Sequence, residues 1–369
     1  MMDFGPSSRR GLTLVELLIG VTIGAILTTA AVAFVRHETR LMGATNERLS
    51  LLQSGRASLD LIASDLQLAG LGTGLDSFNN FGGLLTGPFA IGGIAFNQAG
   101  LNTITLEQGY PSTGSYVVNS DDLGIRLAEG EQSSIVDFVN LGGNGSLRIC
   151  DNPNLNLDAG DLVVLRDELY LASRSVRLDS PSASPACECV AGCTTFTWNE
   201  PAGTGPADGN GYHYVSYPGA ENVDYTLGAL FSAFKTIVYF VADQGSGSNR
   251  GQLRRVVFDP DNPTNTADCA LRTTCGVALA ENVEALFVEV WGFTPGTSTW
   301  TQAPPGGIPG ADRLRVDIEM VMRSRVPANA VQPPAVSGLN GTTFPPAGRD
   351  RIEREVYRTS VDVRNSGRI

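Results

Sequence analysis

The sequence predicts an α+β protein in which a long N-terminal α-helical spine packs on an antiparallel, β-rich globular head. Three observations lead to this fold class. An apolar run near the N-terminus continues without proline into an amphipathic stretch, so residues 12–69 share one helical pattern. After residue 70, short segments alternate apolar and polar residues instead. The chain also contains 43 Gly and 20 Pro, which indicates many turns rather than a helical bundle.

Length and composition exclude some classes of function. The chain has 369 residues, of which 42% are hydrophobic, and this is enough for a sizeable core. The formal net charge is −12. Because binding to nucleic-acid phosphates needs a basic surface, we expect no nucleic-acid partner.

The apolar run extends from Leu12 to Val35, and its only charged residue is Glu16. At about 1.5 Å per residue, a helix of this length measures about 36 Å, enough to cross a hydrocarbon core of about 30 Å. Arg9 and Arg10 precede the run and should hold the N-terminal end in the cytoplasm, although basic residues after the run reduce this asymmetry. We therefore expect residues 12–35 to form a transmembrane or filament-core helix.

Glu16 is unusual because an ionised carboxylate at the centre of a bilayer helix costs about 2.5–3.5 kcal/mol, and such a group usually has a partner. If the chain is cut after Gly11, Leu12 acquires a free amino group. In a bundle, the amine of one subunit could then meet Glu16 of another and set the axial stagger between them. The alternative is a carboxylate near the helix N-terminus that reaches the membrane surface and is stabilised by the helix dipole.

The motif RGLTLVE at residues 10–16, followed by the apolar run, resembles the class III signal of type IV prepilins. The resemblance implies a pilin-like fold and a leader, residues 1–11, that a prepilin peptidase removes. It makes Gly11 the residue before the cut, Leu12 the N-methylated first residue of the mature chain, and Glu16 the assembly glutamate. Leu at the first mature position and the absence of proline from the membrane segment depart from major pilins.

Helical periodicity continues beyond the apolar run, and charged residues lie largely off the apolar stripe. We therefore expect residues 36–70 to continue the spine and to pack one face on the head. Glycines at 70, 72 and 74 should end the helix. The stripe comprises Leu41, Thr45, Leu49, Leu52, Gly55, Leu59, Ile62, Leu66 and Ala69.

Residues 71–369 are expected to form the β-rich head. Residues 243–250 resemble a hairpin loop, and the Pro- and Gly-rich stretches 294–310 and 327–348 are predicted to be surface loops. The candidate strands are Thr103–Leu106, Ser134–Leu141, Leu162–Arg166, Leu169–Val176, Thr236–Ala242, Leu253–Phe258, Val283–Trp291, Arg313–Met322 and Glu355–Val363.

An even number of cysteines in a secreted chain suggests disulfides, and this head holds six. Cys269 and Cys275 could close a small loop. Cys150 and the cluster Cys187, Cys189 and Cys193 could supply two further bonds, with a connectivity that the sequence leaves open. Zinc is the alternative, but the chain has two histidines and no CxxC pair.

We find little that indicates chemistry. The sequence lacks the G-x-S-x-G, H-E-x-x-H and P-loop motifs, so we expect no catalytic residue, no cofactor and no enzymatic activity. Oxygen side chains at Asp151, Asn154, Asp158 and Asp161 are candidate calcium ligands, although clusters of Asp, Asn, Pro and Gly more often form turns.

Scattered segments, namely 65–70, 160–164, 281–286 and 363–365, are similar to long minor pilins of the PilW kind. This resemblance implies a minor pilin in a priming or tip complex that supports pilus assembly and motility or adhesion. Its partners would be other major and minor pilins, through the N-terminal helix, and a tip adhesin. It would lie in the bacterial inner membrane with its head in the periplasm, then at the pilus or cell surface. The alternatives are a pseudopilin of a type II secretion system and an adhesin or ligand-binding head on a pilin anchor.

Overall fold

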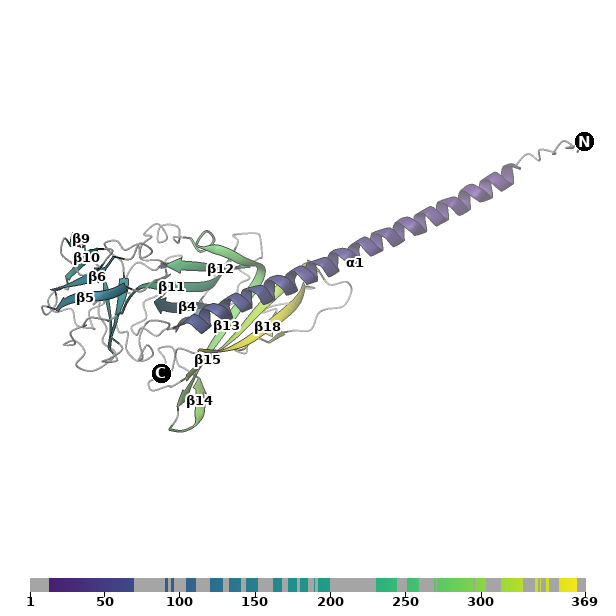
Figure 1. Cartoon of the computed structure of the whole chain (residues 1–369). Helices are drawn as coiled ribbons and strands as arrows, with labels where there is room; N and C mark the ends of the chain where they lie inside the picture. Colours follow the sequence, from purple (N-terminus) through teal and green to yellow (C-terminus); the bar gives the residue numbers. More distant parts are fainter. Residues whose placement is uncertain are drawn as a thin grey trace, which may run out of the picture. The chain divides into compact units, whose positions relative to one another are not determined.

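The chain forms two compact units, Met1–Leu52 and Gln53–Ile369, which we describe separately. One continuous helix begins in the first unit and ends in the second (Figure 1). The computed structural model describes residues 13–69, 90–91, 94–95, 104–110, 120–128, 133–140, 144–151, 162–167, 172–177, 180–184, 189, 192–199, 230–243, 251–258, 269, 271–294, 296–302, 313–327, 336–337, 339, 343–344 and 352–363.

Helix α1 spans Leu14–Leu68. No proline interrupts it, and Leu and Ala, which favour helices, are frequent along it. Its first half is long and apolar enough to cross a membrane, and none of its most apolar window is buried within the chain. The predicted helix of residues 12–69 is therefore confirmed to within a residue at its C-terminal end, while residue 12 lies outside the described residues.

The last turns of α1 belong to the head and bury one face. Gly55, Leu59, Ile62, Leu66 and Ala69 of the predicted stripe are all buried. The earlier members of the stripe behave differently, because Leu41 and Leu49, in the first unit, are exposed. Within the second unit, the predicted stripe is therefore buried from Gly55 to Ala69.

The head is built on one large antiparallel sheet, as the sequence predicted. Each of the nine candidate strands overlaps an observed strand, and β11 pairs with β12 as the predicted hairpin requires. In chain order these strands are β3 (Ile104–Tyr110), β5 (Ser133–Asn140), β7 (Leu162–Asp167), β8 (Ala172–Arg177), β11 (Leu230–Asp243), β12 (Gly251–Phe258), β13 (Val277–Thr294), β15 (Arg313–Pro327) and β18 (Ile352–Val363).

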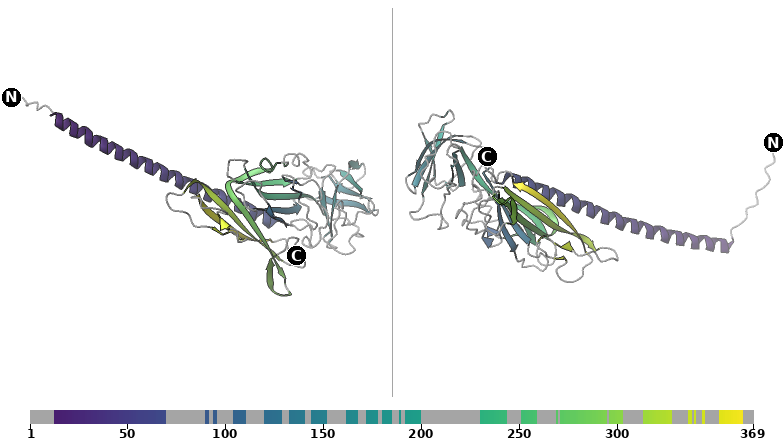
Figure 2. Two further views of the ribbon diagram at one scale, coloured as in Figure 1. Left: turned by 180° about the vertical axis from the view of Figure 1, so that it is seen from behind. Right: turned by 90° about the horizontal axis from the view of Figure 1, so that it is seen from below.

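The sheet contains 14 strands, and its main path runs β18-β15-β13-β12-β11-β5-β6-β10-β9. The core lies on both faces of the middle of this sheet, because consecutive residues are buried there, 282–288 in β13 and 318–323 in β15. On β18 the buried residues lie on one face, at Tyr357, Val361 and Val363. The last turns of α1 lie along this part of the sheet in Figure 1 and in both views of Figure 2, where the strands are green to yellow. A Cβ at Gly55 would lie 3.0 Å from Met322 and from Tyr357, so the helix approaches the sheet closely at this point.

The sequence missed several strands. Two stretches predicted to be surface loops, 294–310 and 327–348, contain strands β14, β16 and β17, because short strands that pair locally need little apolar alternation. The strands that were not predicted are β1 (Ala90–Ile91), β2 (Ile94–Ala95), β4 (Ser120–Ala128), β6 (Asn144–Cys150), β9 (Ser180–Ser184), β10 (Cys193–Asn199), β14 (Thr299–Gln302), β16 (Val336–Ser337) and β17 (Thr343–Phe344).

Strand β4 does not show the alternation of apolar and polar residues that predicts strands, because it begins with three buried polar residues. Ser120 donates to the Leu286 carbonyl and accepts a hydrogen bond from the Leu286 N–H, at 3.3 and 3.0 Å. Asp121 accepts from the Val288 N–H at 2.9 Å. On this edge, β13 pairs with β12 up to Val283 and with β14 from Trp291. Side chains of β4 therefore satisfy backbone groups of β13 between these two pairings.

The cysteines form disulfides. Cys150 is bonded to Cys189, with 5.6 Å between their Cα atoms, and Cys269 is bonded to Cys275, with 4.3 Å between theirs. Cys193 is also in a disulfide. Cysteines joined in this way supply no thiolate for zinc. Cys187 lies outside the described residues.

We predict that Gly55→Leu lowers the free energy of unfolding of the head by about 1–3 kcal/mol, because the new side chain overfills the contact between helix and sheet. Gly43→Leu is the matched control, since nothing lies within 4 Å of a Cβ placed at that helical glycine. Urea unfolding of the full chain in detergent, followed by tryptophan fluorescence, measures both variants. Equal midpoints for Gly55→Leu and the wild type would contradict the packing described here.

Candidate functional site

The N-terminus of α1 is closed by a capping box between Thr13 and Glu16. The Thr13 backbone N–H and its hydroxyl both donate to Glu16 Oε2 at 3.0 Å. In return, the Glu16 N–H donates to Thr13 Oγ1 at 3.3 Å. The Thr13 carbonyl accepts the first helical bond, from the Leu17 N–H at 3.2 Å. These bonds satisfy N–H groups that have no partner within the helix, and they hold the carboxylate at the positive end of the helix dipole.

This arrangement corresponds to the second of the two interpretations of Glu16, in which the helix N-terminus stabilises the carboxylate. The chain described here still carries residues 1–11, so the nitrogen of Leu12 is an amide and not a charged amine. A counter-charge at Leu12 can appear only after the chain is cut. Gly11 and Leu12 themselves lie outside the described residues.

Hydroxyl groups along the first part of α1 are satisfied within the helix. Each donates to the carbonyl four residues earlier, over distances of 2.5–2.9 Å. A hydroxyl bonded in this way needs no water, so the helix surface tolerates an apolar environment. The residues are Thr22, Thr28, Thr29, Thr39 and Thr45.

Apolar side chains are exposed on all sides of the first part of α1. Leu14, Ile26 and Phe34 are among the large side chains that lie open there. A surface of this kind, about one membrane thickness long, is unstable in water and needs lipid or other apolar helices around it. Glu16 is the acidic group within this surface.

At its other end, α1 is attached to the sheet by a buried polar cluster. Asp65 Oδ2 accepts hydrogen bonds from the Tyr239 hydroxyl and from Arg255 Nε, the latter at 2.9 Å. Arg255 Nε also lies 3.1 Å from the Tyr239 hydroxyl oxygen, to which it donates. Burial and the neighbouring Asp65 carboxylate raise the pKa of Tyr239. The tyrosine therefore stays protonated as a donor, and the three side chains join the last turn of α1 to β11 and β12.

The sequence does not reveal this cluster. Asp65 is one of the charged residues expected to lie off the apolar stripe, whereas its side chain is almost fully buried. A lone charge near a predicted helix end gives no sign of partners that lie more than 170 residues away in the chain. Only the spacing of Asp65 one turn before Ala69, beside the buried Leu66, indicated its position close to the core face.

The structure describes one of the four calcium candidates. Asp151 accepts a hydrogen bond from the Thr194 hydroxyl at 2.6 Å, and its N–H donates to the Gly192 carbonyl at 2.9 Å. A Cβ at Gly192 would lie 2.6 Å from Asp151 Oδ2, and the φ of Gly192 is 103°, so glycine is required there. Within the described ranges, no group of three His, Cys, Asp or Glu side chains could hold a metal ion. Asn154, Asp158 and Asp161 lie outside those ranges, and calcium stays a prediction.

Comparison with known proteins adds one specific finding. Residues 6–32 match the prokaryotic N-terminal methylation motif, so the chain carries a prepilin signal. Among solved structures, the chain is similar to a type IV-like pilin from Thermus thermophilus, with 15% identity, 57% of this chain and 87% of that chain covered, and a TM-score of 0.21. No curated protein matches the chain. The motif and the helix that it overlaps therefore carry the functional conclusion.

We predict that Asp65→Ala lowers the free energy of unfolding of the head by about 2 kcal/mol, because it leaves the Arg255 guanidinium and the buried Tyr239 hydroxyl without their acceptor. Asp60→Ala is the control, since Asp60 is an exposed acid on the same helix. Chemical denaturation of the full chain in detergent compares the two. Equal losses of stability in both variants would show that the cluster does not hold the helix.

Proposed function

We propose that this chain is the precursor of a type IV pilin-like subunit, a structural protein that assembles through its N-terminal helix and has no enzymatic activity. One observation carries the proposal. A methylation motif at residues 6–32 overlaps the start of a helix whose apolar side chains are exposed from Leu14 to Val35, and Glu16 is the single charged group of that stretch.

Processing follows from the motif. A membrane prepilin peptidase would cut after Gly11, remove residues 1–11, and methylate the new amino group of Leu12. Residues 12–35 would then anchor the subunit in the bacterial inner membrane and later lie in the filament core. Residues 36–70 would continue the spine, and the head, residues 71–369, would face the periplasm and finally the pilus or cell surface. Disulfides in the head agree with an oxidising compartment.

Assembly depends on Glu16 in this proposal. Neighbouring helices surround the apolar surface of α1 and remove water from it, so the carboxylate loses solvation. The capping box supplies hydrogen bonds but no positive charge. The methylated amine of an adjacent subunit carries that charge, and pairing with Glu16 sets one axial offset between the two helices. A wrong offset leaves both charges unpaired in an apolar surrounding, which is strongly unfavourable.

The finer assignment is a minor pilin of the PilW kind, in a priming or tip complex with other pilins and a tip adhesin. The loose matches along the chain and a head of roughly 300 residues, bulky for a repeating subunit, support it. A pseudopilin of a type II secretion system shares the same N-terminal chemistry. Deletion separates the two roles, because loss of piliation and twitching motility indicates a pilus subunit and loss of exoprotein secretion indicates a pseudopilin.

We predict that the mature chain isolated from a peptidase-competent host begins at Leu12 and carries one added methyl group on its amino nitrogen. Mass spectrometry of the N-terminal peptide measures both features. Replacement of Gly11 by a larger residue should leave the leader attached, and Gly20→Ala, a change within the helix, should be processed normally. A mature chain that still begins at Met1 would end the proposal.

We predict that Glu16→Gln reduces incorporation of the subunit into filaments by at least about tenfold, because a neutral side chain cannot pair with the neighbour's amine. Glu38→Gln is the control, since it removes the same charge from the same helix outside the apolar run. Immunoblots of sheared filaments and of membranes give the ratio of assembled to membrane-held subunit. Normal incorporation of Glu16→Gln would contradict the pairing mechanism.

A further inference from the structure

A short loop between β12 and β13 is closed by the Cys269–Cys275 disulfide. Both cysteines are buried, in a cluster with Val238, Phe240 and Val256. Between the cysteines, Leu271, Thr273 and Thr274 are exposed, but Arg272 turns its side chain inward and leaves only 13% of it accessible. The loop therefore inserts a guanidinium group into the head beside its own disulfide.

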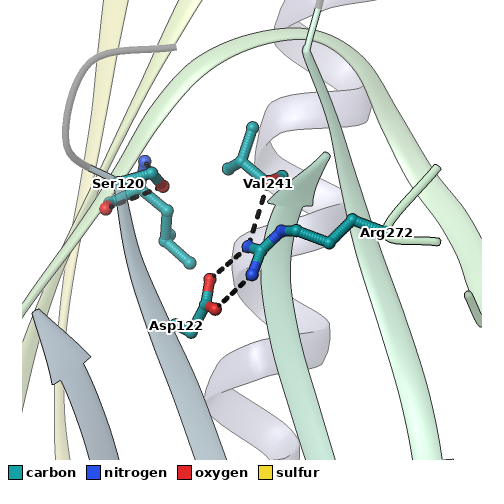
Figure 3. Close-up of polar contacts among 5 residues, drawn as sticks. Ser120, Asp122, Val241 and Arg272 are labelled. Carbon is teal, nitrogen blue, oxygen red and sulfur yellow. Dashed lines mark hydrogen bonds and ion pairs between the residues drawn. The ribbon is translucent and has the colours of Figure 1, made fainter. Parts of the chain in front are cut away.

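Arg272 forms a two-pronged ion pair with Asp122 of β4, as Figure 3 shows. Its two terminal nitrogens donate to the two carboxylate oxygens at 2.7 and 2.6 Å. One of them also donates to the Val241 carbonyl at 3.2 Å, and the guanidinium carbon lies 4.8 Å from the centre of the Phe240 ring. Bidentate geometry of this kind is among the strongest charge-assisted hydrogen bonding in proteins.

Asp122 depends on this partner because its side chain is 1% exposed. Burial raises the pKa of Asp122, and the hydrogen bonds and charge of Arg272 act in the opposite direction. The adjacent Ser120 and Asp121 bond to the backbone of β13 at Leu286 and Val288. The start of β4 is thus the point at which the edge of β13, strand β11 and the disulfide loop meet, and an unpaired carboxylate there would disturb all three.

A second arginine, Arg254 of β12, holds the C-terminal end of the loop by hydrogen bonds. Arg254 Nε donates to the Cys275 carbonyl, and Arg254 Nη2 donates to the Gly276 carbonyl, both at 2.7 Å. Gly276 has a φ of 66°, and a Cβ there would lie 2.3 Å from the carbonyl oxygen of Arg255, so the chain passes very close to β12. These contacts position the end of the loop at Cys275. Because Cys275 is bonded to Cys269, both ends of the loop are held near β12, and this restricts Arg272, which lies between the two cysteines.

We propose that the Cys269–Cys275 disulfide is a redox latch that keeps Arg272 against Asp122. In the dithiol form the loop is free to leave the sheet, and Asp122 then stays buried without its counter-charge. Closing the latch joins the two sulfurs and passes two electrons and two protons to an external disulfide, which becomes two thiols. Opening it by a dithiol such as dithiothreitol reverses the transfer, and the reagent becomes a cyclic disulfide.

The latch makes the stability of the head depend on whether its compartment is reducing or oxidising. This consequence rests on the proposed function, because the head of a pilin-like precursor is made in a reducing compartment and completed in an oxidising one. The coupling between the disulfide and the ion pair does not rest on it. The coupling can be measured on the purified full chain, so its failure would leave the pilin proposal unaffected.

Trypsin reports the latch directly, because Arg272 is itself a cleavage site. We predict that the full chain in detergent micelles is cut after Arg272 at least about tenfold faster in Cys269→Ser/Cys275→Ser than in the wild type, as loss of a buried ion pair implies. Cys150→Ser/Cys189→Ser is the control, since it removes a different disulfide of the same head and should leave this site protected. Mass spectrometry of the digest identifies the cut. Equal rates in the wild type and in Cys269→Ser/Cys275→Ser would overturn the proposal, as would equal acceleration by both disulfide variants.

Asp122→Asn tests the charge itself. In the disulfide-bonded chain it should lower the urea midpoint, because Arg272 loses its anionic partner. In the Cys269→Ser/Cys275→Ser background it should leave the midpoint unchanged or raise it, because it removes a buried charge that the open latch leaves without a partner. The same loss in both backgrounds would overturn the proposal. If the serine variant does not fold, addition of Asp122→Asn must recover folded chain, and failure to recover it also overturns the proposal.

Discussion

Helix α1 exposes apolar side chains on every side from Leu14 to Val35, whereas from Gly55 to Ala69 it buries one face against a β-sheet. The hydrophobic effect acts on both stretches, but only the second finds its apolar partners within the chain. The first must find lipid or other helices. Satisfied threonine hydroxyls and the absence of proline keep this stretch regular and free of unpaired backbone groups, which an apolar surrounding demands.

Two carboxylates on the same helix show how differently a charge can be accommodated. Asp65 is buried by the fold and accepts hydrogen bonds from a tyrosine and an arginine on the sheet, so all its partners belong to the same chain. Among the described residues, Glu16 is bonded to the N-terminus of its own helix alone. That arrangement suffices while the carboxylate faces solvent, but it leaves a net charge once other helices cover it. In the proposed assembly, the amine of the neighbouring subunit neutralises the charge that the capping box leaves on Glu16.

Side chains also replace missing backbone pairing inside the head. Strand β13 is long, and over residues 286–288 its edge away from β15 is bonded by the side chains of Ser120 and Asp121 of β4 rather than by the backbone of a paired strand. Asp122, the next residue, is balanced by an arginine from a loop that a disulfide closes. Three consecutive polar residues thus have three different partners. Burial of polar groups on this scale is tolerated because the hydrogen bonds of each are supplied.

Elements whose signal is local can be recognised in the amino-acid sequence. The apolar run, the motif around Glu16, the single helix and nine of the strands were all predicted, because periodicity and composition are properties of neighbouring residues. The N-cap pair of Thr13 and Glu16 follows the same local logic, three residues apart. Three features come from the folded chain instead: Asp65 contacts Tyr239 and Arg255, Arg272 neutralises Asp122, and β4 begins with buried polar residues. Each of these contacts joins residues more than a hundred positions apart, and the burial that makes them strong does not exist until the sheet has formed.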